Sequence, residues 1–240
     1  MVALRLFICA LIIVVCFARQ WWTVGAVGVG LLFLSVVASA HDLVHSSLGF
    51  KRVVNDILLC AIGLLVLESG HAYRVSHLHH HAHYLDSDDP EGQPAHGSYL
   101  GALLAGPTFL FRLFVFAWKR QRHMRGWLVL EGGWFISALL IAIANWRAHP
   151  TIGIYVLAMI IASWSYPFMT VRLVHDPAGD GPLHQTRTAR GTLTPKLFLE
   201  LGYHLEHHLY PMVPSHHYRE LANSLQPYLD ANNVLPIRVP

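Results

Sequence analysis

The stretch YHLEHHLYPMVP, residues 203–214, places three histidines around one glutamate in a chain that is otherwise apolar. His204, His207 and His208 follow the pattern HxxHH, and residues i, i+3 and i+4 lie on one face of a helix. Three imidazoles on one face indicate a metal site, since imidazole binds zinc, copper, iron or nickel. This stretch alone is also compatible with a single zinc or a loose surface metal trap, so the rest of the sequence has to decide.

Two further histidine groups occur earlier in the chain. His77, His80 and His81 repeat the pattern HxxHH within SHLHHHAHYLDSDDPEG, and His41 and His45 form HxxxH within AHDLVHSSLG. Each group places its rings on one helical face. Eight imidazoles exceed the three or four protein ligands that one zinc takes. The recurring pattern therefore predicts one shared site that holds two metals.

Helix signals flank the third histidine group. Thr194 and Pro195 form a plausible cap and first-turn pair, and Pro211 ends the helical pattern after Leu209. We expect the last two turns of this helix to carry the three rings.

The composition places the chain among integral membrane proteins. Of its 240 residues 54% are hydrophobic and 13% are charged, and the mean hydropathy is +0.41, which is too apolar for a soluble domain of this length. No linker or repeat divides the chain, so we predict a single domain over residues 1–240. Cys9, Cys16 and Cys60 lie in apolar runs, which excludes a disulfide framework. The net charge of +3 comes without a basic patch, so we expect no nucleic-acid partner.

The apolar stretches predict the topology, because a bilayer core needs about 20 helical residues. Four strong candidates for membrane spans are residues 2–18, 22–40, 126–146 and 151–170, and two weaker stretches are 53–69 and 99–118. If the three histidine groups form one site, they lie on the same side of the membrane, so an even number of spans must separate successive groups. The two weaker stretches are therefore predicted to be interfacial. The expected fold is an all-α integral membrane protein with four transmembrane helices in two hairpins, interfacial helices and a histidine-rich cap.

The positive charges test this topology independently. With the N-terminus inside, Arg19 and Arg147 face outward and the other fifteen of the 17 lysines and arginines face the cytoplasm, as the positive-inside rule requires. We therefore predict a multi-pass protein with the metal site and both termini on the cytoplasmic side. A cleaved signal peptide over the first segment is a competing interpretation, and it leaves the side of the histidines unchanged.

The ligand type and its place beside a membrane indicate the chemistry. No HExxH motif of the zinc hydrolases is present. Side-chain acid and base groups cannot break an unactivated C–H bond of a lipid, and this reaction requires a redox cofactor. A binuclear histidine site at a membrane surface therefore indicates iron and oxygen chemistry on a lipid.

The boxes HDLVH, HLHHH and HLEHH, in this order and with apolar hairpins before and between them, resemble the membrane fatty acid desaturase superfamily. The similarity runs over residues 22–220. The tail HHLYPMVPSHHY is similar to the HHLxPxxPxxxY ending of the family, and HAHYLDSDDPEG looks like the acidic stretch after its second box. The resemblance implies a di-iron, O2-dependent oxidoreductase, most simply a fatty acyl desaturase.

The resemblance also implies a ninth ligand. Family members often carry a metal-binding histidine ahead of the third box, and His175 in TVRLVHDP occupies that place, with His184 as the competitor. The implied metal ligands are His41, His45, His77, His80, His81, His175, His204, His207 and His208. His79 and His83 remain unassigned.

Acidic residues beside the boxes are expected to accept hydrogen bonds from the outer N–H groups of the ligands and so to orient the rings. The principal candidates are Asp42 and Glu206. Asp86, Asp88 and Asp89 are further candidates, and for them a solvated or capping role is an equal alternative.

Partners and substrate are less sharply defined. No HPGG signature of a fused cytochrome b5 is present, so the resemblance implies a separate electron donor of the ferredoxin or cytochrome b5 type. The runs GYHLEHHLYPMVP and LVHDP are similar to bacterial carotene ketolases as well as to acyl desaturases, which makes a carotenoid ketolase or hydroxylase the alternative. More distant alternatives are a membrane zinc hydrolase and a non-enzymatic metal-binding protein.

Overall fold

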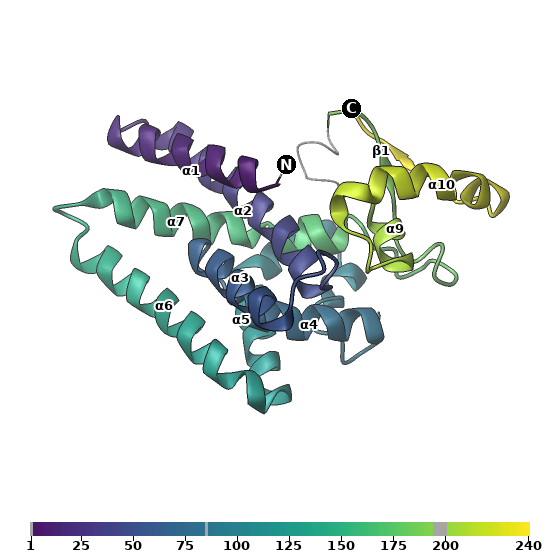
Figure 1. Ribbon diagram of the computed structural model, residues 1–240, viewed down its shortest axis with the longest axis horizontal. Coiled ribbons are helices and arrows are strands. Elements are labelled where there is room, and N and C mark those ends of the chain that lie inside the picture. Colours follow the sequence, from purple (N-terminus) through teal and green to yellow (C-terminus); the bar gives the residue numbers. More distant parts are fainter. Residues whose placement is uncertain (1, 85, 194–200) are drawn as a thin grey trace.

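The computed structural model describes residues 2–84, 86–193 and 201–240, which form a predominantly helical protein (Figure 1). Its α-helices are α1 (Val2–Ala18), α2 (Trp22–Val44), α3 (Arg52–Leu65), α4 (Gly70–Ala82), α5 (Tyr99–Arg120), α6 (Arg125–Ala144), α7 (Pro150–Trp164), α9 (His204–Leu209) and α10 (Tyr218–Ala231). Shorter helical turns are η1 (Gln93–His96), η2 (Arg122–Met124), η3 (Pro167–Arg172) and η4 (Ser215–His217). Two short parallel strands, β1 (Ala189–Arg190) and β2 (Ile237–Arg238), complete the described chain. The expected all-α class is confirmed, while the predicted helix start at Thr194 and Pro195 lies outside the described residues.

Four described helical stretches are long and apolar enough to cross a membrane, in agreement with the predicted number. They are Trp22–Val44, Tyr99–Arg120, Arg122–Asn145 and Pro150–Arg172. The members differ from the predicted set: α1 has 17 residues, slightly short for a bilayer core, and α5 continues through Pro107 as one helix of 22 residues. Length and composition therefore do not separate α5 from the spanning helices, and its interfacial placement stays a prediction.

Helices α3 and α4 form a sharply bent pair. Their axes meet at 111° across the break between them. Leu67 in the break has a positive φ of 61°. Gly70, the first residue of α4, passes so close to α3 that a Cβ atom would lie 2.6 Å from the carbonyl oxygen of Leu59, and only glycine avoids this overlap. The bend turns the histidine-bearing helix α4 back against α2.

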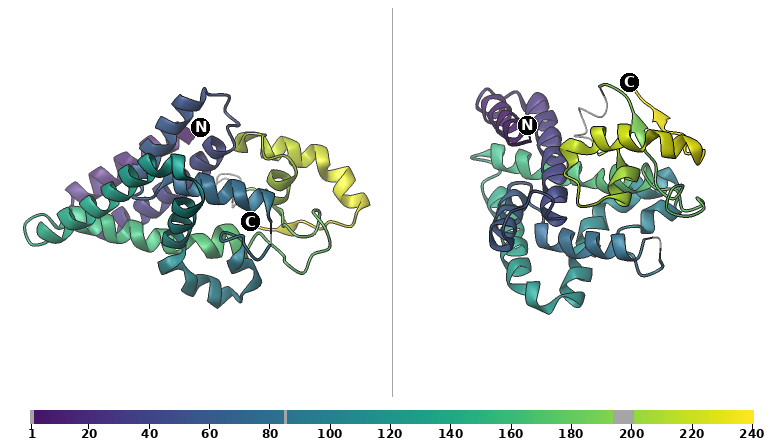
Figure 2. Two further views of the ribbon diagram at one scale, coloured as in Figure 1. Left: turned by 90° about the horizontal axis from the view of Figure 1, so that it is seen from below. Right: turned by 45° about the vertical axis from the view of Figure 1, so that its right-hand side comes forward.

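Two helical hairpins, α1 with α2 and α6 with α7, define the long dimension of the molecule (Figure 1). Their turns lie at one end, whereas α9 and α10 lie at the other end in both orientations (Figures 1 and 2). Helix α2 also packs along α7 and joins the two hairpins. The arrangement separates the turns that carry Arg19 and Arg147 from the end of the molecule that carries the C-terminal histidines.

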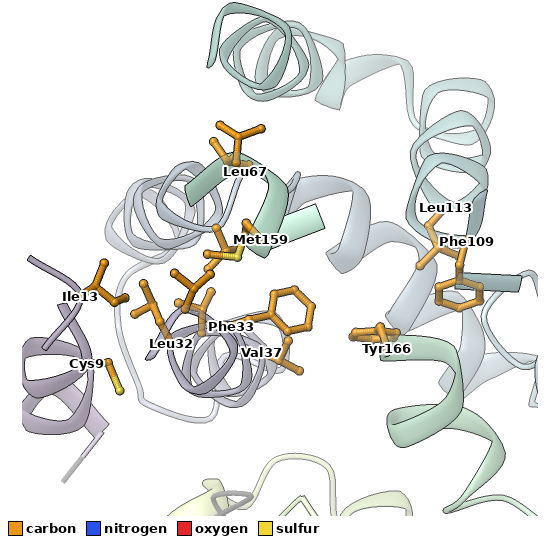
Figure 3. Packing of buried hydrophobic residues seen from close by; sticks show 14 of the residues in the cluster. Cys9, Ile13, Leu32, Phe33, Val37, Leu67, Phe109, Leu113, Met159 and Tyr166 are labelled. Carbon is orange, nitrogen blue, oxygen red and sulfur yellow. The ribbon is translucent and has the colours of Figure 1, made fainter. Parts of the chain in front are cut away.

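The main hydrophobic core lies where the hairpins meet. Leu32 and Phe33 of α2 are buried with Met159 of α7 (Figure 3). The cluster continues to Phe109 of α5 and to Tyr166 just before η3, whose rings stack with centroids 5.7 Å apart. Burial of a large apolar side chain contributes about 1.5–3 kcal/mol, so this cluster holds α5 and the end of α7 against α2.

Helix α6 is the least covered of the long helices. Its side chains Val129, Ile136, Leu140 and Ile143 are each more than half exposed. An apolar surface of this kind on a helix of membrane-spanning length is a lipid-facing surface, because water would disfavour it.

A buried polar network ties α4 to α6 within this apolar surrounding. Glu131 of α6 accepts hydrogen bonds from Ser69 Oγ at 2.6 Å and from His71 Nδ1 at 2.7 Å. The His71 ring is fully buried and stacks on Trp127 with a centroid separation of 4.5 Å. Arg74, on the next turn of α4, forms an ion pair with Asp56 of α3. Ionisable groups inside apolar helices persist only when they are paired, so the network sets the position of α4.

The Glu131→Ala variant is expected to lower the thermal stability of the detergent-solubilised protein. It leaves the buried ring N–H of His71 and the partly buried hydroxyl of Ser69 without an acceptor, and a buried unsatisfied donor costs about 1–3 kcal/mol. Thermal unfolding followed by circular dichroism measures the shift. Glu220→Ala, which removes a carboxylate from an exposed pair with His217, is the control. An equal melting temperature for both variants would show that the network does not position α4.

Candidate metal centre

Four separate segments bring nine histidines to one place. His41 lies in the last turn of α2, and His45 is the first residue after that helix. His77, His80 and His81 come from one face of α4, and His175 follows η3. His204, His207 and His208 come from the short helix α9. The structure therefore brings together all nine residues singled out in the sequence.

The nine rings form two adjoining groups. His41, His45, His77 and His207 make the first group, and His80, His175, His204 and His208 make the second. Within each group the closest ligand nitrogens all lie within 4.8 Å of one another. His81 stands at the junction, because it clusters with His207 of the first group and His208 of the second.

The inner nitrogens converge at distances close to those that a shared metal imposes. In the second group His175 Nε2 lies 3.2 Å from His80 Nε2, 2.9 Å from His204 Nε2 and 3.3 Å from His208 Nε2. In the first group His41 Nε2 lies 2.9 Å from His207 Nε2. Two nitrogens bound at about 2.1 Å to one ion, at the angles of four- or six-coordination, are about 3.0–3.4 Å apart.

The outer nitrogens of four of the nine histidines have their own acceptors, which orient the rings. His80 Nδ1 donates to Asp89 Oδ2 at 2.7 Å, and His77 Nδ1 donates to Glu91 Oε1 at 2.9 Å. His175 Nδ1 donates to the carbonyl oxygen of Val171 at 2.8 Å, and His207 Nδ1 lies 2.9 Å from the hydroxyl of Tyr218. A proton held on Nδ1 leaves Nε2 as a free lone pair that points into the group.

Burial keeps most of these rings neutral. It lowers the pKa of His175 to about 3 and that of His45 to about 4. Burial, reinforced by neighbouring imidazoles, holds the pKa values of His77, His204 and His207 well below the usual range. Neutral imidazole is the form that binds metals, so the centre is prepared for ligation at neutral pH.

His80 is the exception among the ligands. Burial opposes its protonation, but the hydrogen bond to Asp89 and the charges of Glu91 and Asp89 outweigh that effect and raise its pKa. Burial also raises the pKa of Glu91 itself to about 7. Glu91 accepts a further hydrogen bond from the hydroxyl of Tyr166 at 3.1 Å, so this carboxyl group joins the α7 side of the site to His77.

A tight turn places the two orienting carboxylates. The backbone N–H of Glu91 donates to Asp89 Oδ1 at 3.1 Å. At Gly92 a Cβ atom would lie 2.1 Å from Asp89 Oδ2 and 3.4 Å from His80 Nδ1. A side chain at position 92 would therefore push Asp89 away from the ring that it orients.

The two acidic residues expected to orient the ligands make other contacts. Asp42 accepts hydrogen bonds from Ser215 N at 2.9 Å and Ser215 Oγ at 2.7 Å, and so joins α2 to η4. Glu206 accepts from Thr188 Oγ1 at 2.7 Å and pairs with Arg190 at 2.5 Å. The helix directs Glu206 away from the histidines on either side of it, because i and i+1 do not share a face. Both residues lie next to the centre and fix its backbone.

Three further histidines that the sequence offered, His79 and His83 of the second box and His184 as the alternative to His175, do not join the nine. His79 and His83 group instead with Asp88 on another side of α4. His184 is exposed, and its Nδ1 lies 3.3 Å from the carbonyl oxygen of Asp180. Glu91 and Tyr218 are the residues that sequence reasoning missed. The acidic run after the second box was the available signal for Glu91.

A cavity of about 280 Å³ opens against the histidines. His41, His77, His80, His175 and His204 line one wall, and the rest is largely apolar, with Leu34, Val37, Met169 and Leu173 among the lining residues. A second cavity, of about 290 Å³, lies between α2, α5, α6 and α7 and shares Val37, Tyr73 and Tyr166 with the first. Two tyrosines thus stand between the two cavities.

The donor set fits two resident metal ions. His45 Nε2 and His77 Nε2 are buried and have no hydrogen-bond partner, although an unsatisfied buried acceptor costs about 1–3 kcal/mol. Nine imidazoles without a cysteine suit zinc, copper or iron better than calcium or magnesium, which prefer oxygen ligands. The arrangement can therefore hold two borderline transition-metal ions beside an apolar cavity.

Comparisons with known proteins agree with the geometry. A sequence model of the fatty acid desaturase family matches residues 19–239. An omega-3 fatty acid desaturase, chloroplastic, from Brassica napus is 21% identical over 255 aligned residues. The alignment covers 89% of this chain and 63% of that relative. The chain thus spans less than two thirds of the length of the plant protein.

The Asp42→Ala variant is expected to loosen the C-terminal segment from α2. It removes two acceptors from Ser215, a loss of about 1–3 kcal/mol. Hydrogen exchange followed by mass spectrometry should show faster exchange over residues 203–222. Asp230→Ala, which removes an exposed acid from the same segment, is the control. Unchanged exchange in Asp42→Ala would exclude the proposed link between α2 and η4.

Proposed function

The chain belongs to the fatty acid desaturase family, and we propose that it is a membrane di-iron oxidoreductase that introduces a double bond into the acyl chain of a lipid. The observation that carries the proposal is the convergence of nine buried or half-buried imidazoles in two adjoining groups, five of which line an apolar cavity. Family membership supports an oxidoreductase, and the donor set supports two ions of one kind.

The ligands would divide between two irons as the two groups divide. His41, His45, His77 and His207 would hold one iron, His80, His175, His204 and His208 would hold the other, and His81 would add a ligand at the junction of the two groups. When bound, iron supplies the capacity to use O2 for removing hydrogen from an unactivated methylene, which no side chain possesses. The chain's own residues position the ions, exclude water and present the substrate.

Asp89 and Glu91 act through the rings that they hold. A carboxylate that accepts the outer N–H of a ligand fixes its orientation and raises its basicity. Asp89 does so for His80 and Glu91 for His77, so each of the two groups contains a ligand oriented by an acid. Tyr218 holds His207 in the same manner. These are positioning residues.

The apolar lining supports a lipid chain as substrate. The cavity against the histidines shares Tyr73 and Tyr166 with the second cavity, whose lining includes Phe33, Leu110, Phe114 and other apolar side chains. Such a lining excludes water from the reacting carbon and favours a saturated chain over a polar molecule. The two neighbouring cavities would hold the chain on either side of the carbon that reacts.

The overall reaction requires a partner for electrons. Two hydrogen atoms leave adjacent methylenes, and O2 is reduced to two waters with two further electrons and two protons. A separate ferredoxin or cytochrome b5 type protein would supply these electrons. In the proposed topology the metal centre and both termini lie on the cytoplasmic side of the membrane, so the donor would deliver its electrons from that side.

Cells that express the protein should gain an unsaturated lipid whose mass is lower by two hydrogens, and the His207→Ala variant should abolish this product. His207 belongs to the first group and also contacts His81, so its loss disrupts the centre at the junction. Lipid profiling by mass spectrometry, beside metal analysis of the purified protein, measures both effects. His123→Ala alters an exposed histidine that joins no group and should retain full activity.

Other outcomes of this experiment point to other functions. A gain of oxygen, or coloured oxygenated product in a carotene-producing host, would indicate the carotenoid ketolase or hydroxylase. One zinc and no iron would indicate a zinc enzyme and overturn the proposal. Full activity of the His207→Ala variant would contradict the proposal that the nine histidines are the metal ligands.

The Asp89→Asn variant should weaken iron binding without abolishing it. Loss of an outer partner of a metal-bound histidine typically lowers affinity or activity about 10–100-fold. Iron retained after dialysis against graded chelator concentrations measures the change. Asp86→Asn, on the same loop but without contact to the nine histidines, should match the wild type. If Asp89→Asn retains iron as firmly as the wild type, Asp89 does not position His80.

A further inference from the structure

A second group of metal-binding side chains lies outside the nine-histidine centre. His79 and His83 are four residues apart at the end of α4, so they share a face of the chain that differs from the face of His77, His80 and His81. Their ligand atoms and a carboxylate oxygen of Asp88 all lie within 4.8 Å of one another. None of the three belongs to either group of the main centre.

The geometry of the three side chains matches one small ion. The rings of His79 and His83 stack with centroids 4.2 Å apart. His79 Nε2 lies 3.4 Å from Asp88 Oδ2. Two ligand atoms at about 2.0–2.1 Å from a tetrahedral zinc are about 3.4 Å apart. His79 Nε2 also lies 3.2 Å from the carbonyl oxygen of Asp88, a hydrogen bond that a metal would replace.

The environment favours a site with one rigid ligand and an open position. The His79 side chain is 5% exposed, and its ring packs against Phe116 of α5 at 5.0 Å. The side chains of His83 and Asp88 are 40% and 56% exposed. Three protein ligands therefore leave the fourth position to water. Two imidazoles and a carboxylate suit zinc, which takes nitrogen and oxygen ligands in four-coordination.

We propose that His79, His83 and Asp88 bind a zinc ion that is separate from the main metal centre. The ion closes the loop that runs from the end of α4 to η1. That loop carries Asp89, next to Asp88, and Glu91, which hold the outer nitrogens of His80 and His77. Zinc bound to His79, His83 and Asp88, here called the trio, would act as a clamp: it would hold in place one end of the segment that orients His80 and His77 of the main centre.

Zinc titration of the full-length, detergent-purified protein tests the proposal. Metal is removed, iron is restored, and bound zinc is measured by mass spectrometry after equilibrium dialysis at graded Zn²⁺ concentrations. The wild type should bind one equivalent more than His83→Ala. The loss of a direct ligand should weaken this equivalent by more than about 100-fold, the upper figure for the loss of an outer-shell partner.

Two further variants separate this site from the main centre and from surface binding. His207→Ala disrupts the nine-histidine centre but should keep the extra zinc, so failure of the proposed di-iron function leaves this result intact. His123→Ala removes an exposed histidine outside the trio and should bind zinc as the wild type does. Hydrogen exchange over residues 86–92 should slow on addition of zinc in the wild type and remain unchanged in His83→Ala.

The opposite results would overturn the zinc site. Equal zinc stoichiometry and affinity in the wild type and in His83→Ala would exclude the trio as ligands. Loss of the extra zinc in His207→Ala would assign it to the main centre. Exchange over residues 86–92 that does not respond to zinc in the wild type would exclude the clamp.

Discussion

The mutual approach of unprotonated imidazole nitrogens is the constraint on which the rest of this molecule depends. Lone pairs of His175, His80 and His204 face one another at about 3 Å in a buried site, and such an arrangement is unfavourable without a cation or a shared proton. A protein can hold it only if the surrounding structure is rigid. The two hairpins, the bent pair α3 and α4 and the C-terminal helices α9 and α10 supply that rigidity from different directions.

Rigidity at the centre comes from carboxylates and backbone groups that lie outside the ring of ligands. Asp89, Glu91, Tyr218 and the carbonyl oxygen of Val171 each hold one outer nitrogen. These contacts select the tautomer in which Nε2 is free. The orientation of the rings thus depends on loops as much as on helices, and the short turn that ends in Gly92 is a part of the site.

Away from the centre, buried polar pairs decide where the histidine-bearing helices lie. The network of Glu131, His71 and Ser69 anchors the start of α4 to α6, and the contact of Asp42 with Ser215 anchors η4 to α2. In an apolar surrounding each such pair has few alternative partners, so it specifies one arrangement where hydrophobic packing alone would permit several.

The sequence by itself determined the class of the protein, eight of the nine histidines of the centre and the alternation of apolar helices with histidine boxes, whereas His175 was implied by the resemblance to the desaturase family. These features are local: apolar length, a spacing of three and four residues and the order of motifs are all visible along the chain. Only the tertiary structure decided which residues orient the rings. Glu206 stands between two ligands in the sequence yet faces Arg190 and Thr188, because a helix turns neighbours to different faces. Asp89 and Glu91, 9 and 14 residues from their histidines, reach them through a loop whose path no periodicity predicts. The same holds for α5, which continues as one helix through Pro107, since packing against α4 and α7 compensates for the hydrogen bond that proline removes.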